Sequence, residues 1–320
     1  MPTAKVKSST GETTFNYTIS TPSVSSASVY RQQLTDVAVH PWVLLRATDL
    51  PTSVACRQFE DPQIRKFNCV ALDLRLYGRT TTDGIPEGYG VKEAAEDLAL
   101  FMDEVGLPAC HIVGLSMGTM LGIALAVNYP NKVASLFLVS PLGLEELAGV
   151  ASGRREIADI WIEGFKTGRL DMTAISDSMY GAYQLGFNNN RNSLVRALDG
   201  ISLPLALKNA VPARFEQYER GTVDFLNNRT EYSEDQLSRI CVPVKLLREA
   251  GVTVSLATIP EAPHFGVVTH GDIVNWLLHD FIIDICETSV PQVPGEVSSP
   301  WEEELVKAGW NKGVNDPEDD

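Results

Sequence analysis

Short apolar runs alternate with helical patterns along the first 141 residues. The segment TTFNYTIST at 13–21 alternates apolar and polar side chains, which predicts an edge strand. Strand and helix patterns then follow one another as WVLL, CVALDL, VKEAAEDLALFMDEVG, HIVGLS, GTMLGIALAVNYP and VASLFLVSP. Strands and helices in this alternation predict an α/β fold, with a mostly parallel central sheet flanked by helices and joined by right-handed crossovers.

The pattern changes after Pro141. Residues 142–236 show helical periodicity with Gly and Pro breaks and no convincing strand, which predicts a helical cap inserted over the sheet. Strand patterns return with ICVPVKLL and VTVSLATIP, and GDIVNWLLHDFIID predicts a closing helix. The end of the chain is rich in Pro, Ser and acidic residues, which is typical of disorder, although WEEELVKAGW could form a short helix. We therefore divide the chain into core segments at 1–141 and 237–286, a cap at 142–236 and an acidic, disordered tail at 287–320.

Composition and charge narrow the class of protein. With 320 residues, of which 44% are hydrophobic and 21% charged, the chain can bury the core of one large α/β domain with a cap. The net charge of -15 argues against a nucleic-acid partner, because phosphate binding needs clustered Lys and Arg. The five cysteines lack Cys-x-x-Cys spacing, which predicts reduced thiols. No segment has the pattern of a secretory signal or a membrane span, so we expect a cytoplasmic protein with no membrane partner.

A Gly-x-Ser-x-Gly pentapeptide lies where a predicted strand meets a predicted helix. It consists of Gly114, Leu115, Ser116, Met117 and Gly118. A serine on such a sharp turn takes a strained conformation, and the flanking glycines give the turn room to close. In this interpretation Ser116 is a nucleophile, and the backbone N–H of Met117 points at an oxyanion. The alternative is a glycine-rich connection with a structural serine.

A nucleophilic serine needs a base within hydrogen-bonding reach. His264 lies in PEAPHFGVV, between the last predicted strand and the closing helix. That loop lies at the carboxyl edge of the parallel sheet, which is also the edge that carries Ser116. We therefore predict His264 as the base; a surface loop histidine is the alternative. His270 is a weaker candidate, and His111, on the strand before the nucleophile, suits a packing role better.

This arrangement resembles the α/β-hydrolase fold family of the capped type, over roughly residues 13–286. The resemblance rests on LDLRLYG, VGLSMG, VNYPNKVASLFLVSP and APHF, and the flanking sequences look most like those of uncharacterised fungal members. It implies a serine-hydrolase triad in the chain order Ser, acid, His. It also implies a second oxyanion donor in the loop LLRATDL, where the backbone N–H of Ala47 or Thr48 would serve.

The family's acid is missing from its usual place. That acid commonly follows the penultimate strand, but here VPVKLL runs through REAG straight into VTVSLATIP, with no Asp between Val242 and His264. Parallel neighbouring strands need a crossover of about a dozen residues or more. The penultimate strand and acid loop are therefore interpreted as truncated: either a segment is lost or the region pairs differently. Some capped members place the acid one strand earlier, so Glu145 is the candidate acid, with Glu146 as its substitute.

Two functions follow from these residues. The first is a serine hydrolase that cleaves an ester, lactone or related acyl bond of a small molecule. The second is a catalytically impaired, hydrolase-like protein that binds a small molecule beneath its cap. We expect no metal or organic cofactor, because the histidines and cysteines show no ligand spacing. Hydride transfer is excluded because no Gly-x-Gly-x-x-Gly follows the first strand. The sequence leaves the substrate and the oligomeric state open.

Overall fold

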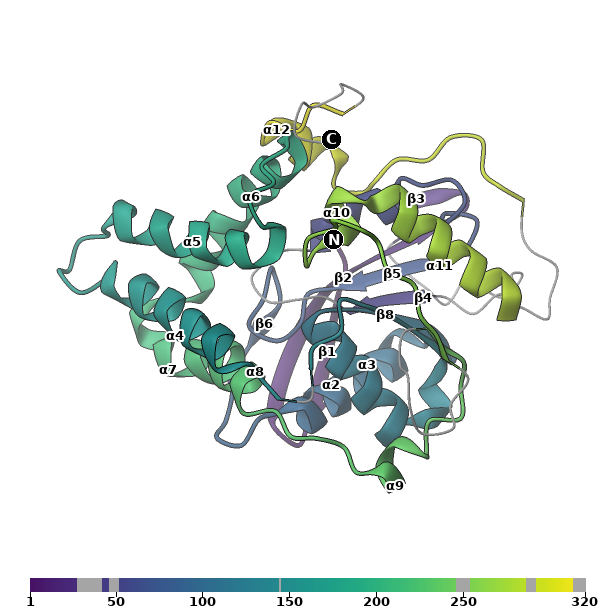
Figure 1. Ribbon diagram of the computed structural model, residues 1–320, viewed down its shortest axis with the longest axis horizontal. Helices are drawn as coiled ribbons and strands as arrows, with labels where there is room; N and C mark the ends of the chain where they lie inside the picture. Colours follow the sequence, from purple (N-terminus) through teal and green to yellow (C-terminus); the bar gives the residue numbers. More distant parts are fainter. Residues whose placement is uncertain (28–41, 46–51, 144, 246–253, 286–291, 313–320) are drawn as a thin grey trace.

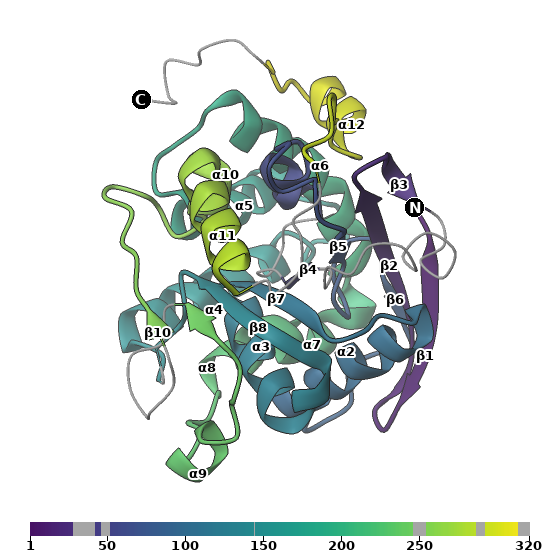
Figure 2. The same cartoon turned by 90° about the vertical axis from the view of Figure 1, so that its right-hand side faces the viewer.

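The structure is a computed structural model that describes residues 1–27, 42–45, 52–143, 145–245, 254–285 and 292–312. Its described strands form one twisted sheet in the order β1-β2-β5-β4-β7-β8-β9-β10, and β3 and β6 pair with β2 (Figure 2). From β5 to β10 the strands on this path pair in parallel, whereas β2 pairs antiparallel with both β1 and β5. The predicted α/β fold with a mostly parallel sheet is therefore confirmed. The prediction that residues 13–21 form an edge strand is wrong, because the preceding segment forms β1 and covers that side of β2. The strand bounds are β1 Thr3–Ser8, β2 Gly11–Thr21, β3 Val24–Ala27, β4 Trp42–Leu45, β5 Cys69–Leu72, β6 Thr81–Thr82, β7 Cys110–Leu115, β8 Val133–Val139, β9 Val244–Lys245 and β10 Val254–Ser255.

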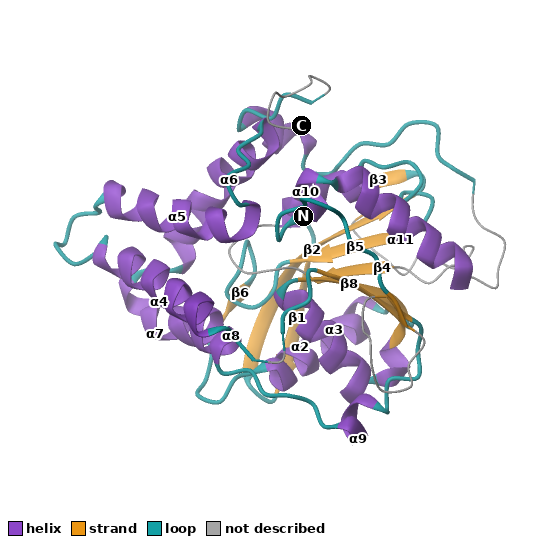
Figure 3. Ribbon diagram, viewed as in Figure 1, coloured by secondary structure: helices purple, strands orange, loops and turns teal. Residues whose placement is uncertain are grey.

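Helices cover both faces of this sheet (Figure 3). One face carries α2 and α3, and the other carries α1, α10 and α11 (Figure 1). The alternation of side chains along β8 explains the two cores, because Leu136 and Leu138 pack with the first layer whereas Phe137 and Val139 pack with the second. The bounds of these helices are α1 Cys56–Phe59, α2 Val91–Val105, α3 Met117–Asn128, α10 Gly266–Thr269 and α11 Gly271–Ile285.

Helices also make up the lobe that follows β8. Between residues 142 and 236 the described residues contain helices and no strand, as the periodicity predicts. Helices α4 and α5 pack side by side, and together with α7 and α8 they lie to the left of the sheet in Figure 1, whereas α6 lies at the top and α9 at the bottom of that view. The helices are α4 Ala148–Glu163, α5 Met172–Phe187, α6 Ser193–Asn209, α7 Phe215–Tyr218, α8 Phe225–Asn227 and α9 Glu234–Leu237. None of the helices in the described parts of the chain combines the length and the apolarity needed to cross a membrane.

Two strands follow β8 in the region that the sequence interprets as truncated. Within the described residues, the predicted strands at 240–247 and 252–260 contain β9 and β10, of two residues each. They are parallel neighbours, with Val244 opposite Val254. The chain between them, residues 246–253, lies outside the described residues.

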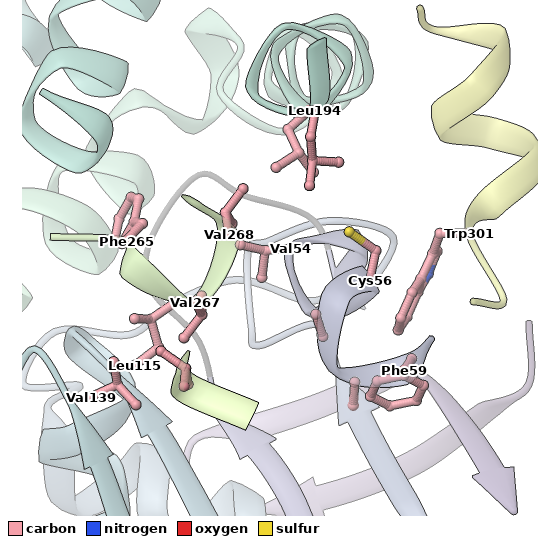
Figure 4. Packing of buried hydrophobic residues seen from close by; sticks show 14 of the residues in the cluster. Val54, Cys56, Phe59, Leu115, Val139, Leu194, Phe265, Val267, Val268 and Trp301 are labelled. Carbon is pink, nitrogen blue, oxygen red and sulfur yellow. The ribbon is translucent and has the colours of Figure 1, made fainter. Parts of the chain in front are cut away.

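The predicted disorder of the tail is wrong between residues 292 and 312. Helix α12, Glu302–Lys307, packs against α6, and the indole of Trp301 is 1% exposed. Trp301 meets the ring of Phe59 edge to face at 4.9 Å (Figure 4). The tail is polar on average, so its composition gives no sign that Trp301, Leu305 and Trp310 are buried. The burial of these three side chains outweighs the entropic cost of ordering the segment.

Candidate active site

Ser116 lies on the sharp turn between β7 and α3. Its backbone angles, φ 52° and ψ −115°, fall in a region that side-chain-bearing residues rarely adopt. The turn is fixed by the Ser116 N–H, which donates to the carbonyl oxygen of Val139 at 3.0 Å. On the other side, the hydroxyl of Thr119 donates to the carbonyl oxygen of Ser116 at 2.6 Å. The strain is thus held by hydrogen bonds to the neighbouring strand and to the first turn of the helix.

Gly114 is required because the turn folds back on its own backbone. A Cβ atom added at Gly114 would lie 2.6 Å from the carbonyl oxygen of Gly118 and 2.8 Å from the Cα of Thr119. Atoms of the main chain cannot move aside as a flexible side chain can. The spacing of glycines in the motif therefore has the steric origin that the sequence indicates.

His264 meets Ser116 across 148 positions of sequence. Its Nε2 lies 2.7 Å from the Oγ of Ser116. The loop that carries the imidazole is anchored by Phe265, whose N–H donates to the carbonyl oxygen of Gly186 in α5 at 2.8 Å. Just beyond it, Val267 packs near the carboxyl end of β7 (Figure 4). The predicted pair of serine and histidine is therefore in hydrogen-bonding contact.

The surroundings of His264 favour its neutral form. Burial lowers the pKa of His264 below its ordinary value, and the guanidinium of Arg154 lowers it further. The carboxylate of Glu146 opposes both effects. A neutral imidazole can accept a proton, which a base must do.

The candidate acids are not hydrogen-bonded to His264. Glu145 is exposed, whereas Glu146 accepts hydrogen bonds from Arg154 at 2.8 Å and from Arg229 at 3.0 Å. Among the described residues, no carboxylate hydrogen-bonds to the His264 ring. Burial opposes ionisation of Glu146, but the bonds from the two arginines hold its pKa below the usual value. The assignment of Glu145 or Glu146 as triad acid therefore has no hydrogen bond to support it.

The remaining predicted residues lie in different places. Met117 is the first residue of α3, directly after the nucleophile, whereas Ala47 and Thr48 lie outside the described residues. His111 is buried in the sheet with its Nδ1 2.8 Å from the hydroxyl of Ser135, as a packing role requires. The Nδ1 of His270 lies 2.9 Å from the hydroxyl of the adjacent Thr269.

A cavity of about 310 Å³ opens above the serine and the histidine. It lies between the sheet edge and the helical lobe, with α4 and α5 contributing to its wall. A smaller apolar chamber of about 50 Å³ shares part of this wall, including Ile157 and Tyr183. Within the described ranges, no cluster of His, Cys, Asp or Glu has the arrangement of a metal site. The space suits a small organic molecule with an apolar part.

Two arginines of the site have no signal in the sequence. Arg154 on α4 lines the cavity. Arg229 follows α8 in the chain and donates a hydrogen bond to Glu146. Neither falls in a motif, because the periodicity of a helix does not tell which of its polar side chains faces a cavity. Only their shared partner, Glu146, is a candidate site residue from the sequence.

The fold and site match a known family. The family model described as alpha/beta hydrolase fold matches residues 52–234, more than half of the chain. The protein therefore belongs to the α/β-hydrolase fold family. The matched residues include Ser116, whereas His264, which lies 2.7 Å from its Oγ, follows them in the chain.

Individual relatives match over shorter or more distant stretches. The dihydrolipoyllysine-residue acetyltransferase component of the acetoin cleaving system of Cupriavidus necator is 40% identical over 96 residues, 30% of this chain and 25% of that protein. A Variovorax paradoxus protein named carbamate hydrolase RutD is 37% identical over 71 residues, 22% of this chain and 26% of that protein. The matches thus span about a quarter of each relative. A solved thermophilic esterase from Thermogutta terrifontis superposes with a TM-score of 0.64 at 16% identity, covering 88% of this chain and 98% of that one. At this identity, the likeness concerns the fold alone.

Proposed function

We propose that the protein is a serine hydrolase that cleaves an ester or a related acyl bond of a small molecule. The observation that carries this proposal is the 2.7 Å contact between the Oγ of Ser116 and the Nε2 of His264 at the floor of a cavity. The strained serine backbone and the lowered pKa of the imidazole support it. The names of the relatives, an esterase and a carbamate hydrolase among them, agree with acyl chemistry.

The reaction would follow the order of a serine hydrolase. The Oγ of Ser116 attacks the substrate carbonyl carbon while its proton passes to the Nε2 of His264. The N–H of Met117 at the start of α3 binds the oxyanion, with the N–H of Ala47 or Thr48 as the second donor. The bond to the leaving alcohol breaks as His264 returns the proton to its oxygen. A water molecule then gives a proton to His264 and its oxygen attacks the carbonyl carbon of the acyl-serine ester. As the bond to the Oγ of Ser116 breaks, His264 returns this proton to the Oγ, which releases the acid and restores Ser116.

Labelling with a fluorophosphonate probe tests the nucleophile. We expect the probe to label the wild-type protein at Ser116 and to leave Ser116→Ala unlabelled. His264→Ala should label far more slowly, whereas His270→Ala, six residues along the chain, should label at the wild-type rate. Failure to label wild-type protein that melts as a folded chain would refute the proposal.

A second function is favoured by one observation. Because no described carboxylate hydrogen-bonds to His264, the protein could be a hydrolase-like binder of small molecules with impaired turnover. In serine proteases of unrelated fold that use a Ser-His-Asp triad, replacing the acid lowers turnover by about 10⁴-fold while the geometry stays intact. Labelling at Ser116 with no measurable turnover of any ester would support this alternative.

A further inference from the structure

Three charged side chains form a nearly buried cluster beside the nucleophile. Glu146 lies between Arg154, at 2.8 Å, and Arg229, at 3.0 Å. The exposed fractions of the side chains are 8% for Glu146, 16% for Arg154 and 4% for Arg229. Charges that are removed from water to this extent need partners of opposite sign.

The cluster holds one more positive charge than negative charge. Among the described residues, Glu146 is the only acidic partner of either arginine. Arg229 is well satisfied, because it also donates to the carbonyl oxygens of Gly143 at 2.8 Å and Leu226 at 2.7 Å. Within the part of the chain that the structure describes, Arg154 makes one hydrogen bond, through Nη2 to Glu146, and its Nε is buried without a partner. Arg154 is therefore the cation of the cluster with fewer hydrogen bonds, and it shares its one acidic partner with Arg229.

Arg154 faces the space in which the substrate would react. It lines the 310 Å³ cavity together with Glu146, Ser116 and His264. Its field reaches the reacting groups, since it contributes to lowering the pKa of His264. An anion bound to Arg154 would thus lie within the length of a small substrate from the nucleophile. A guanidinium binds a carboxylate especially well, because its N–H groups match the two oxygens.

We propose that Arg154 binds a carboxylate of the substrate, so that the site accepts acyl esters that carry a second, free carboxylate, such as monoesters of dicarboxylic acids. This inference rests on the proposed hydrolase function and specifies its substrate class. Glu146 is a positioning residue that holds the guanidinium of Arg154 over the cavity. Arg229 is a positioning residue one step further back, since it ties Glu146 to the backbone at Gly143.

Matched substrates test the anchor. Monoethyl adipate and ethyl hexanoate have the same chain length and differ in a carboxylate that replaces a methyl group. We expect Arg154→Gln to lower kcat/KM for monoethyl adipate by about 10- to 100-fold, the strength of a hydrogen bond to a charged group. On the pH plateau of both proteins, the loss for ethyl hexanoate, which has no carboxylate, should be much smaller, and Arg154→Lys should recover part of the loss on monoethyl adipate. Monoethyl succinate and monoethyl glutarate would find the preferred chain length.

Arg155 provides the matched control. It is the next residue of α4, is 42% exposed, and pairs with Glu219 and Asp224 at 3.1 and 2.9 Å, away from the cavity. Arg155→Gln should leave the kinetics of both substrates unchanged. The inference would be overturned if Arg154→Gln lowered kcat/KM equally for both substrates, or if it lowered kcat/KM for none of the monoesters. In either case, hydrolysis of ethyl hexanoate that depends on Ser116 would leave the proposed function standing.

A binding measurement separates the two ideas in the other direction. We expect calorimetry to detect monoethyl adipate bound to Ser116→Ala and to show weaker binding when Arg154→Gln is added. If this difference is seen but the wild type is neither labelled nor active, the carboxylate anchor stands and the hydrolase proposal fails. If neither binding nor the kinetics depends on Arg154, the anchor is refuted.

Discussion

Adding one methyl group at Gly114 should break the nucleophile elbow. In Gly114→Ala the new Cβ would lie 2.6 Å from the carbonyl oxygen of Gly118, and 2.8 Å from both its carbonyl carbon and the Cα of Thr119. All three atoms belong to the main chain of the turn and the first turn of α3. The turn must open by several tenths of an ångström, and Ser116 moves with it.

The size of the effect follows from these contacts. Overpacking a well-packed site costs about 1–3 kcal/mol, and we expect the upper end because no flexible side chain can yield. A loss of about 3 kcal/mol lowers the midpoint of thermal unfolding of a chain this long by roughly 5 °C. Since a misplacement of about 1 Å can cost about 10²-fold in rate, a shift of Ser116 by several tenths of an ångström should slow its labelling by up to about 10²-fold. Differential scanning fluorimetry and the rate of fluorophosphonate labelling measure the two effects.

Gly122 supplies the control on the same helix. A Cβ added there meets only side-chain methyl groups, at 3.3 Å from Ile112 and 3.6 Å from Leu136. Replacing a glycine inside a helix with alanine gains about 1 kcal/mol of propensity, so Gly122→Ala should be neutral or slightly stabilising. Wild-type stability and labelling in Gly114→Ala would show that the steric reasoning about the elbow is wrong.

Two further predictions concern the base and the tail. The neutral form of His264 persists below pH 6.5, because burial and then Arg154 lower its pKa, so the acid limb of kcat/KM for ethyl hexanoate should lie below that pH. Arg154→Gln removes one of these two effects and should shift the acid limb to higher pH, whereas Arg155→Gln should not shift it. An acid limb above pH 6.5 in the wild-type protein would contradict a lowered pKa of His264. Trp301→Ala should destabilise the fold by about 3–5 kcal/mol in urea titrations, because the indole is buried against the core. Trp276→Ala, where the indole is 64% exposed, should change stability by less than about 0.5 kcal/mol, and equal effects of the two substitutions would refute the packing of the tail.

The elbow could be predicted from sequence because its causes are local. The strand, the turn and the helix follow one another within a few residues of Ser116, and the steric need for Gly114 acts inside the motif itself. His264 could also be placed, since the carboxyl ends of parallel strands share one edge of the sheet. Ser116 and His264 could therefore both be expected at this edge of the sheet.

The charged cluster could not be predicted, because it depends on the direction of single side chains. Arg154 and Arg155 are adjacent and of the same type, yet the first lines the cavity, whereas the second pairs with Glu219 and is not part of the lining. Hydrophobic periodicity places the apolar face of α4 and says nothing of such a difference. The burial of Trp301 could not be predicted either, because composition describes the average polarity of a segment. A single buried indole can nevertheless hold that segment against the core.

In the proposed reaction, the charge that forms on His264 connects the partners of its ring with the substrate class. As His264 takes the proton of Ser116 it would become a cation, which a triad acid stabilises. Here burial and Arg154 disfavour the protonated form of His264. Among the groups that shift the pKa of His264, Glu146 alone favours this form. A substrate carboxylate on Arg154 would add a negative charge near the imidazole as the cation forms, so it should raise kcat as well as lower KM relative to ethyl hexanoate. A monoester that improves KM alone would mean that the carboxylate anchors the substrate without easing proton transfer.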